Sequence, residues 1–198
     1  MRRYWNVFDA RCTVGRHVTW RAGAPHSVRD LLTEMDHHAI AEALVWDCLG
    51  IEHHPAEGNR RVVRFTAGHP RLRPVWTALP AAGRHEQPPP ADFLAELRRQ
   101  RVAAVALFPR QFRFRLADWC VDAFLEPLAA ARVPVFICPN EFGSGRDWQQ
   151  DATDWPELVA LCRRWPNLPV ILTEFRIRQT QRMAYRALEA CPNLRLEL

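Results

Sequence analysis

Carboxylate and guanidinium side chains recur directly after short apolar runs of the sequence, where they could bind and transform a small molecule. Glu141 and Glu174 each follow such a run. Two neighbouring carboxylates can differ in pKa, so that one acts as general acid and the other as general base. With Asp9, which follows the first apolar run, they are the candidate catalytic residues. The candidate substrate-binding residues are the polar and cationic ones beside such runs: Arg11, Arg110, Asn140 and Arg176.

Each of these candidates also has an ordinary structural interpretation. Asp9 can cap its own loop by accepting backbone hydrogen bonds. The two glutamates can form ion pairs with arginines that lie close to them in sequence: Arg146, Arg176 and Arg178. Both interpretations stay open at the level of sequence.

A second group of chemically active side chains crowds one short segment. Histidine, cysteine and carboxylate ligands together could bind zinc. Their spacing matches no closed zinc motif, which favours a solvated loop instead. The members of the group are Asp47, Cys48, Glu52, His53 and His54.

Cys138 follows another apolar run and could be a nucleophile if a cation lowered the pKa of its thiol. No histidine is close to it in sequence, although His17, His26 or His54 could approach in space. A small buried residue is the favoured interpretation of Cys138.

Seven apolar runs, spaced roughly 32 residues apart from start to start, indicate the elements that position these side chains. Most runs lack polar alternation, and helical periodicity fills most of the intervals, which is typical of a parallel sheet covered on both faces. The predicted strands are residues 4–9, 42–46, 72–79, 103–108, 134–138, 169–173 and 194–198. A first helix is predicted to begin at the capping residue Ser27. The other predicted helices cover residues 59–67, 91–100, 116–131, 155–164 and 178–190.

This pattern fits a (β/α) barrel with about seven strands, and it also fits a doubly wound sheet. Residues 10–16 contain one glycine where a dinucleotide-binding fingerprint needs three, which favours the barrel. In either fold, ligands bind at the carboxyl ends of the strands. We therefore predict an α/β fold, an incomplete TIM-like barrel forming one domain over residues 1–198.

Composition limits the classes of function. All 27 basic residues are arginine, so lysine Schiff-base chemistry and a P-loop lysine are excluded. The arginines are scattered, which disfavours a nucleic-acid partner. The six cysteines include no CxxC pair, and no run of apolar residues is long enough to span a membrane. These features predict a cytoplasmic protein with reduced thiols, a small-molecule ligand and no membrane partner.

Several segments, in order along nearly the whole chain, resemble the amidohydrolase-related (amidohydrolase 2 type) metal-dependent hydrolases. Residues 8–15 (FDARCTVG) resemble the first-strand motif of that family, and residues 27–36 resemble its first helix. Three further segments follow in the family's order: Gly58-Asn59 before a helix, residues 165–172 (WPNLPVIL) and residues 192–197 (PNLRLE). The resemblance implies a distorted TIM barrel that hydrolyses or non-oxidatively decarboxylates a small, often carboxylated molecule with a zinc-like ion.

The sequence departs from this family at the metal ligands. The positions of the metal-binding histidines hold Arg11, Thr13, Cys138 and Glu174, and arginine stays protonated and cannot bind zinc. We therefore expect the divalent metal to be lost; any other cofactor is unknown. The expected function is hydrolysis or decarboxylation with a remodelled or absent metal site. The alternative is a non-catalytic relative that binds a small anionic ligand or a protein partner.

The end of the chain raises a separate expectation. An eighth strand, and the metal-binding aspartate that ends it in the family, would lie beyond Leu198. Without that strand a barrel has two unpaired edges. We expect an open barrel whose gap is covered by a homodimer contact or by the N-terminal segment, unless the chain is a fragment of a longer protein.

Overall fold

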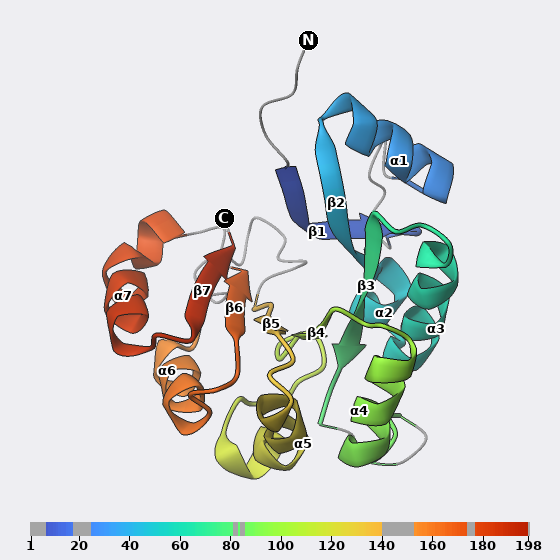
Figure 1. Cartoon of the computed structure of the whole chain (residues 1–198). Helices are drawn as coiled ribbons and strands as arrows, with labels where there is room; N and C mark the ends of the chain where they lie inside the picture. The colour runs from blue at the N-terminus through green and yellow to red at the C-terminus, as the bar shows by residue number, and fades with distance from the viewer. Residues whose placement is uncertain are drawn as a thin grey trace. The chain divides into compact units, whose positions relative to one another are not determined.

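The computed structural model describes residues 7–17, 25–80, 83, 86–139, 153–173 and 177–197, which form seven strands alternating with helices (Figure 1). The chain packs as two compact units. The first unit comprises Met1–Thr77 and Glu96–Ala103, and the second comprises Ala78–Ala95 and Ala104–Leu198. The expectation of a single domain stays a prediction. No helix among the described residues is long and apolar enough to cross a membrane.

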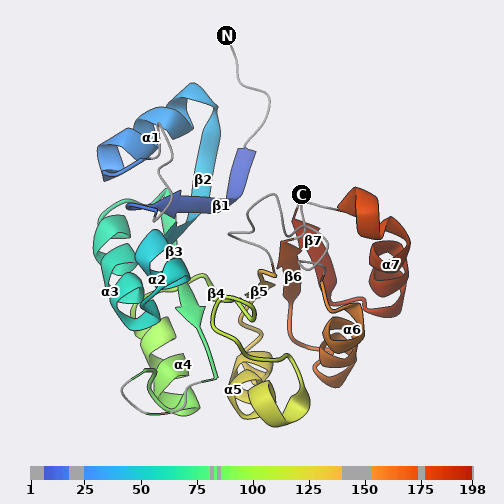
Figure 2. The same cartoon turned by 180° about the vertical axis from the view of Figure 1, so that it is seen from behind.

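The first unit is a parallel three-stranded sheet with its helices. Its strands β1, β2 and β3 are adjacent in that order, and α3 packs against α2 and β2, on the same side of the strands as α2 (Figures 1 and 2). The elements are β1 (Val7–Val14), α1 (Val28–His37), β2 (Ile40–Asp47), α2 (Cys48–Glu52), α3 (Pro55–Thr66) and β3 (Leu72–Ala78).

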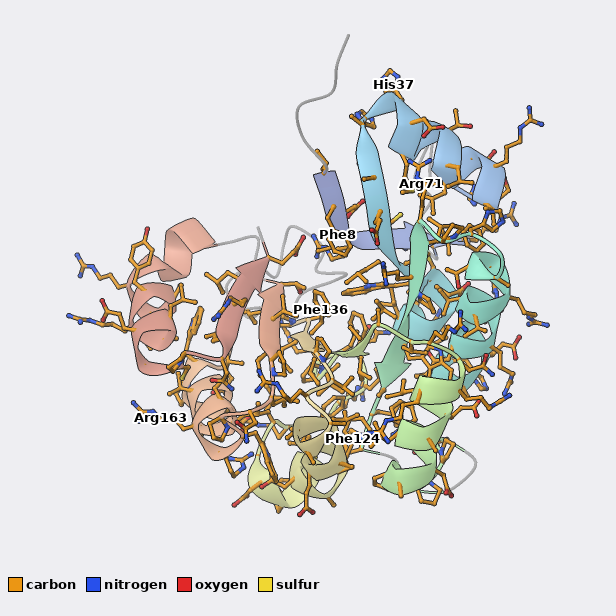
Figure 3. The ribbon with its side chains drawn as sticks, viewed as in Figure 1. Phe8, His37, Arg71, Phe124, Phe136 and Arg163 are labelled. Carbon is orange, nitrogen blue, oxygen red and sulfur yellow. The ribbon has the colours of Figure 1, made fainter. Side chains whose placement is uncertain are left out.

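Helix α1 follows from local sequence signals. Ser27 caps it as predicted: its hydroxyl accepts the Asp30 N–H, and the Asp30 carboxylate accepts the Ser27 N–H. Leu31 and Met35 point into the core from one face. The helix then connects to the sheet through Arg71, labelled in Figure 3, whose guanidinium donates to Asp36 and to the backbone carbonyls of Ile40 and Ala41.

Strand β1 differs from its prediction. It runs from Val7 to Val14 instead of ending at Asp9. A bulge between Asp9 and Cys12 contains the polar residues that resemble a strand end, and the pairing with β2 resumes after it. After the bulge, Cys12, Thr13 and Val14 pair with β2. The Asp9 carboxylate accepts the Arg11 N–H at 2.9 Å, so Asp9 stabilises the bulge from inside the strand.

The segment predicted as a solvated loop after β2 is also different. Residues Cys48–Glu52 form helix α2, and α3 begins at Pro55, four residues before its predicted start. His54 caps α3 by accepting the Glu57 N–H, and Pro55 presets the backbone of the first turn. Gly58 and Asn59 therefore lie inside a helix and do not precede one.

The second unit is a parallel four-stranded sheet. Its strands match the predicted runs within one or two residues, and β4 and β5 are buried throughout, as their unbroken apolar sequences predict. Phe124 of α5 is labelled in Figure 3. Its ring centroid lies 5.5 Å from that of Phe93 of α4. The elements are α4 (Pro90–Arg99, shared between the units), β4 (Ala104–Leu107), α5 (Asp118–Ala130), β5 (Val135–Ile137), α6 (Trp155–Arg164), β6 (Val170–Thr173), α7 (Ile177–Ala190) and β7 (Leu194–Glu197).

Strand order decides between the two predicted fold classes. Strands β1 to β3 and β4 to β7 each follow one another in sequence order. Ala103, the residue before β4, donates its N–H to the Pro74 carbonyl of β3 at 2.9 Å. A doubly wound sheet would place β4 beside β1. The order therefore confirms the TIM-like (β/α) fold with seven parallel strands.

Asn193, the residue before β7, links the start of that strand to the end of α6 and to the turn before β6 in the second unit. Its amide nitrogen lies 2.9–3.2 Å from the carbonyl oxygens of Cys162, Trp165 and Leu168. We expect Asn193→Ala to lower the free energy of unfolding by about 2 kcal/mol, because at least one carbonyl loses its donor. Asn167→Ala, at the exposed equivalent position of the repeated Pro-Asn-Leu motif, should stay within about 0.5 kcal/mol of the wild type. Urea unfolding of both variants measures the difference; equal losses would contradict it.

Candidate functional site

A buried cluster of hydrogen-bonding side chains lies at the carboxyl ends of β1 and β2 in the first unit. His17 Nδ1 lies 2.9 Å from Glu52 Oε1. On the other side of the same ring, His17 Nε2 lies 3.2 Å from Cys48 Sγ and 3.3 Å from Thr13 Oγ1. This His17 cluster, made of Thr13, His17, Cys48 and Glu52, joins a thiol, an imidazole and a carboxylate in one chain of contacts.

Local backbone structure brings the four residues together. After β1 ends, Gly15 adopts a φ of 95°, a conformation that suits glycine, and His17 follows two residues later. At the end of β2, Asp47 caps α2 by accepting the Leu49 N–H at 2.9 Å, which places Cys48 at the first position of the helix. Glu52 lies four residues further, one turn along the same helix face.

Burial makes the hydrogen bonds of the cluster strong. The side chains of His17 and Glu52 are 4% and 6% exposed, and Cys48 has no exposed surface. A buried imidazole beside a carboxylate carries its hydrogen on the nitrogen that faces the carboxylate. We therefore assign the hydrogen to Nδ1, which leaves Nε2 to accept from the Cys48 thiol or the Thr13 hydroxyl.

Asp47 and Arg61 form an ion pair beside the cluster, with 3.3 Å between Arg61 Nε and Asp47 Oδ2. Burial raises the pKa of the Asp47 carboxyl, and Arg61 offsets part of this increase. A Cβ atom on Gly15 would lie 3.3 Å from Arg61 and 3.5 Å from Asp47, so the turn after β1 packs tightly on this ion pair.

Cys12, on β1, is a second buried thiol of the first unit. Burial, together with the negative charges of Asp9 and Cys48, raises the pKa of the Cys12 thiol to about 12. Burial and a hydrogen-bonding contact with Cys191 raise the pKa of Cys162 in the second unit to about 12 as well. Both thiols stay protonated and unreactive at neutral pH.

These two raised pKa values predict a loss of stability in alkali. In the unfolded chain each thiol ionises near pH 9.0, whereas in the folded chain it stays protonated until about pH 12. The stabilisation is fully present below pH 9 and is lost as the pH rises towards 12, by roughly 1.4 kcal/mol per thiol at about pH 10. Urea unfolding from about pH 8 to about pH 11 should show a shallower decline for Cys12→Ser than for the wild type. Parallel declines would contradict the assignment.

The structure places some of the predicted site residues and leaves others outside the described residues. Asp9 lies within β1, Arg11 is half-buried two residues further, and Thr13 is part of the His17 cluster. In the second unit, Arg110 is exposed in the turn after β4, and Cys138 is buried at the end of β5. The residues outside the described part of the chain are Asn140, Glu141, Glu174 and Arg176. The acid–base pairing of the two glutamates stays a prediction.

Sequence reasoning missed the central feature of the site. Asp47, Cys48 and Glu52 are buried, so the interpretation of their segment as a solvated loop is wrong for them, although His53 and His54 are exposed. His17 contacts Cys48, 31 residues away. One local signal was available: the capping aspartate Asp47 followed by Cys48 and Glu52 at helical spacing.

The described residues do not fit the metal that the amidohydrolase resemblance implies. Arg11 stays cationic and repels a metal ion, and the Thr13 hydroxyl is hydrogen-bonded to His17. Among the residues that the structure describes, no group of three histidine, cysteine, aspartate or glutamate side chains is arranged to hold a metal ion.

Comparison with known proteins supports the fold. No protein-family profile matches the chain, and no curated protein sequence matches it. Among solved structures it is similar to an uncharacterised TIM-barrel protein of Bordetella bronchiseptica, with 18% identity and a TM-score of 0.61 over 86% of this chain. The chain spans only 58% of the length of that protein.

Two further similar structures have assigned chemistry or family. The 5-carboxyvanillate decarboxylase of Sphingomonas paucimobilis is 15% identical, with a TM-score of 0.60 over 98% of this chain and 76% of its own. An amidohydrolase 2 of Bifidobacterium longum subsp. infantis is 13% identical, with a TM-score of 0.55 over 96% and 72% of the two chains. At these identities the likeness shows a shared TIM-barrel fold.

Proposed function

We propose that the chain hydrolyses or non-oxidatively decarboxylates a small carboxylated molecule on a TIM-barrel scaffold of the amidohydrolase type, without a metal held by first-strand histidines. The similarity to a decarboxylase of a carboxylated aromatic acid supports the substrate class. The departures at Arg11 and Thr13 support the absence of the metal.

The observation that carries this proposal is the buried His17–Glu52 pair at the carboxyl ends of β1 and β2. TIM-barrel enzymes hold their catalytic groups at this end of the strands. A histidine held in place by a carboxylate can accept a proton from one group and return it to another. In hydrolysis His17 accepts a proton from the attacking group, and in decarboxylation it returns a proton to the carbon that has lost CO2.

Arg11 supplies the complementary binding group. It lies on the same strand as Thr13, is half-buried, and carries a permanent charge. A guanidinium binds a carboxylate through two parallel hydrogen bonds, which fixes the orientation of the substrate as well as its charge. Asp9, Glu141 and Glu174 keep their proposed catalytic roles, and Arg110, Asn140 and Arg176 keep theirs in binding.

The test is turnover of a substrate panel by protein treated with a chelator. The panel contains aromatic carboxylic acids, whose turnover is measured as CO2 release. It also contains lactones and amides that carry a second carboxylate, whose turnover is measured as acid release. We expect turnover to survive chelation and Arg11→Gln to lower kcat/KM by about 10²-fold, with partial recovery in Arg11→Lys. Binding of these acids without turnover of any of them would overturn the proposal in favour of a non-catalytic relative.

A further inference from the structure

We propose that Cys48 is the nucleophile of an acyl-transfer reaction in which His17 is the general base and Glu52 the positioning residue. The inference rests on the proposed function for its substrate class, a small carboxylic acid in ester, thioester or amide form. It goes further by naming the group that attacks the substrate and by selecting hydrolysis over decarboxylation.

The order of contacts supports these roles. The sulfur of Cys48 lies 3.2 Å from His17 Nε2, and the carboxylate of Glu52 lies 2.9 Å from Nδ1 of the same ring. A nucleophile in contact with a base that is itself oriented by a third group is the arrangement shared by covalent hydrolases. The three residues come from the turn after β1 and from the two ends of α2, so backbone structure holds each of them.

Acidity distinguishes Cys48 from the other donor at Nε2. Thr13 Oγ1 lies 3.3 Å from the same nitrogen. A thiol ionises several pH units below an aliphatic hydroxyl, so the imidazole removes the proton of Cys48 and leaves that of Thr13 in place. With the proton on Nε2, the Thr13 hydroxyl oxygen accepts a hydrogen bond from that nitrogen and helps to hold the ring in place.

Two ion pairs lie beside the thiol: Arg61 of α3 pairs with Asp47 at the end of β2, and His17, when protonated, pairs with Glu52 of α2. Cys12 contributes no charge, since its raised pKa keeps the thiol neutral. The ion pair of Cys48 with His17 therefore depends on Glu52, which stabilises the imidazolium directly.

Burial restricts what the sulfur can attack. Cys48 is fully buried, while Thr13 beside it and Gly15, whose carbonyl lies 3.7 Å from the sulfur, are half-buried. Because Cys48 has no exposed surface, Thr13 or Gly15 must shift before a substrate carbonyl can reach the sulfur, which selects small acyl groups. Exclusion of water also strengthens the thiolate–imidazolium interaction.

The reaction balances without any co-reactant other than water. The Cys48 thiolate attacks the carbonyl carbon, an S–C bond forms, and the C–O, C–S or C–N bond to the leaving group breaks as the His17 imidazolium protonates that group. Water, deprotonated by His17, then attacks the thioester, which releases the carboxylic acid and returns the proton to the sulfur.

Competitive alkylation tests the thiol independently of any substrate. Native protein is treated with limiting iodoacetamide, and the labelled cysteines are identified by peptide mass spectrometry. Exposure alone predicts that Cys120, which is half-exposed on α5, reacts before the buried Cys48. We expect the reverse at neutral pH, with Cys48 faster by about 10-fold. Faster labelling of Cys120 than of Cys48 would overturn the proposal.

Three variants separate chemistry from folding. Ionisation of Cys48 is measured as the difference in thiolate absorbance between the wild type and Cys48→Ser. This measurement does not require a reagent to reach the buried sulfur. His17→Gln should remove this signal at neutral pH, and Glu52→Gln should move its pH midpoint upward while circular dichroism stays unchanged. A midpoint that is identical in the wild type and Glu52→Gln contradicts the positioning role.

The acyl step is tested with p-nitrophenyl acetate. We expect an initial burst and an acetyl group trapped on Cys48, both absent in Cys48→Ser and retained in Cys120→Ser. Ester turnover that survives in Cys48→Ser overturns the proposal. A reactive, acetylated Cys48 together with no turnover of the carboxylated panel would disprove the proposed substrate class while confirming the nucleophile, so the two failures are distinguishable.

Discussion

Gly58→Ala is expected to destabilise the first unit by at least about 3 kcal/mol, because the new methyl group would overlap the backbone of α2. A Cβ atom at this position would lie 2.2 Å from both the Cα and the N of Gly50. Backbone atoms cannot rotate away as a side chain can, so α2 and α3 would have to separate. Since α2 carries Cys48 and Glu52, the variant should also slow alkylation of Cys48. Urea unfolding and the alkylation assay measure the two effects.

Two other glycines provide matched controls for this prediction. Gly50→Ala would bring a Cβ atom 3.3 Å from Gly58 Cα, a contact that small shifts relieve, so its cost should be clearly smaller. Gly68 has nothing within 4 Å of a Cβ atom but a φ of 77°, and its replacement by alanine should cost about 1 kcal/mol from backbone strain alone. A Gly58→Ala variant as stable as Gly68→Ala would show that the helices are not in close contact.

Asn59→Ala is expected to cost about 3 kcal/mol of unfolding free energy. In the first unit, the Asn59 side chain donates to the Thr77 carbonyl at 2.8 Å and accepts the Thr77 N–H at 2.9 Å, and both residues are buried. Alanine leaves both backbone groups of β3 without a partner in the core, where water cannot replace the side chain. The measurement is again the urea midpoint.

Thr66→Val, on the same helix, is the control for this second prediction. The Thr66 hydroxyl donates to the Val62 carbonyl, which is already bonded within α3, and to the Val63 carbonyl of the half-buried last turn, where water can replace the hydroxyl. We expect a cost below about 1 kcal/mol. If the two variants lose equal stability, then the Asn59 amide is not what attaches α3 to β3.

Local signals were sufficient for much of the fold. The capping serine of α1, the capping aspartate and proline at the start of α6, and the Pro-Asn pairs before β6 and β7 act within a few residues of the chain. The unbroken apolar runs of β4 and β5 predicted strands that are buried on both faces. For this reason the α/β class, the number of strands and most element boundaries could be predicted from sequence.

Register and short helices could not be predicted in the same way. The bulge in β1 exists because Cys12, Thr13 and Val14 pair with β2, more than 30 residues away, and no local pattern encodes that pairing. Helix α2 has five residues, too few to show periodicity. Asp9 accordingly appeared to end a strand that in fact continues to Val14.

The sequence by itself determined the fold class and the absence of lysine chemistry, and it predicted that Arg11 and Thr13 stand where the family it resembles has metal-binding histidines. Only the tertiary structure decided that His17, Cys48 and Glu52 form one buried cluster. The reason is that their contact depends on the parallel pairing of β1 with β2, which brings the turn after one strand against the helix after the next. Sequence records the residue types of such a site, whereas the distances between them arise from strand pairing and burial.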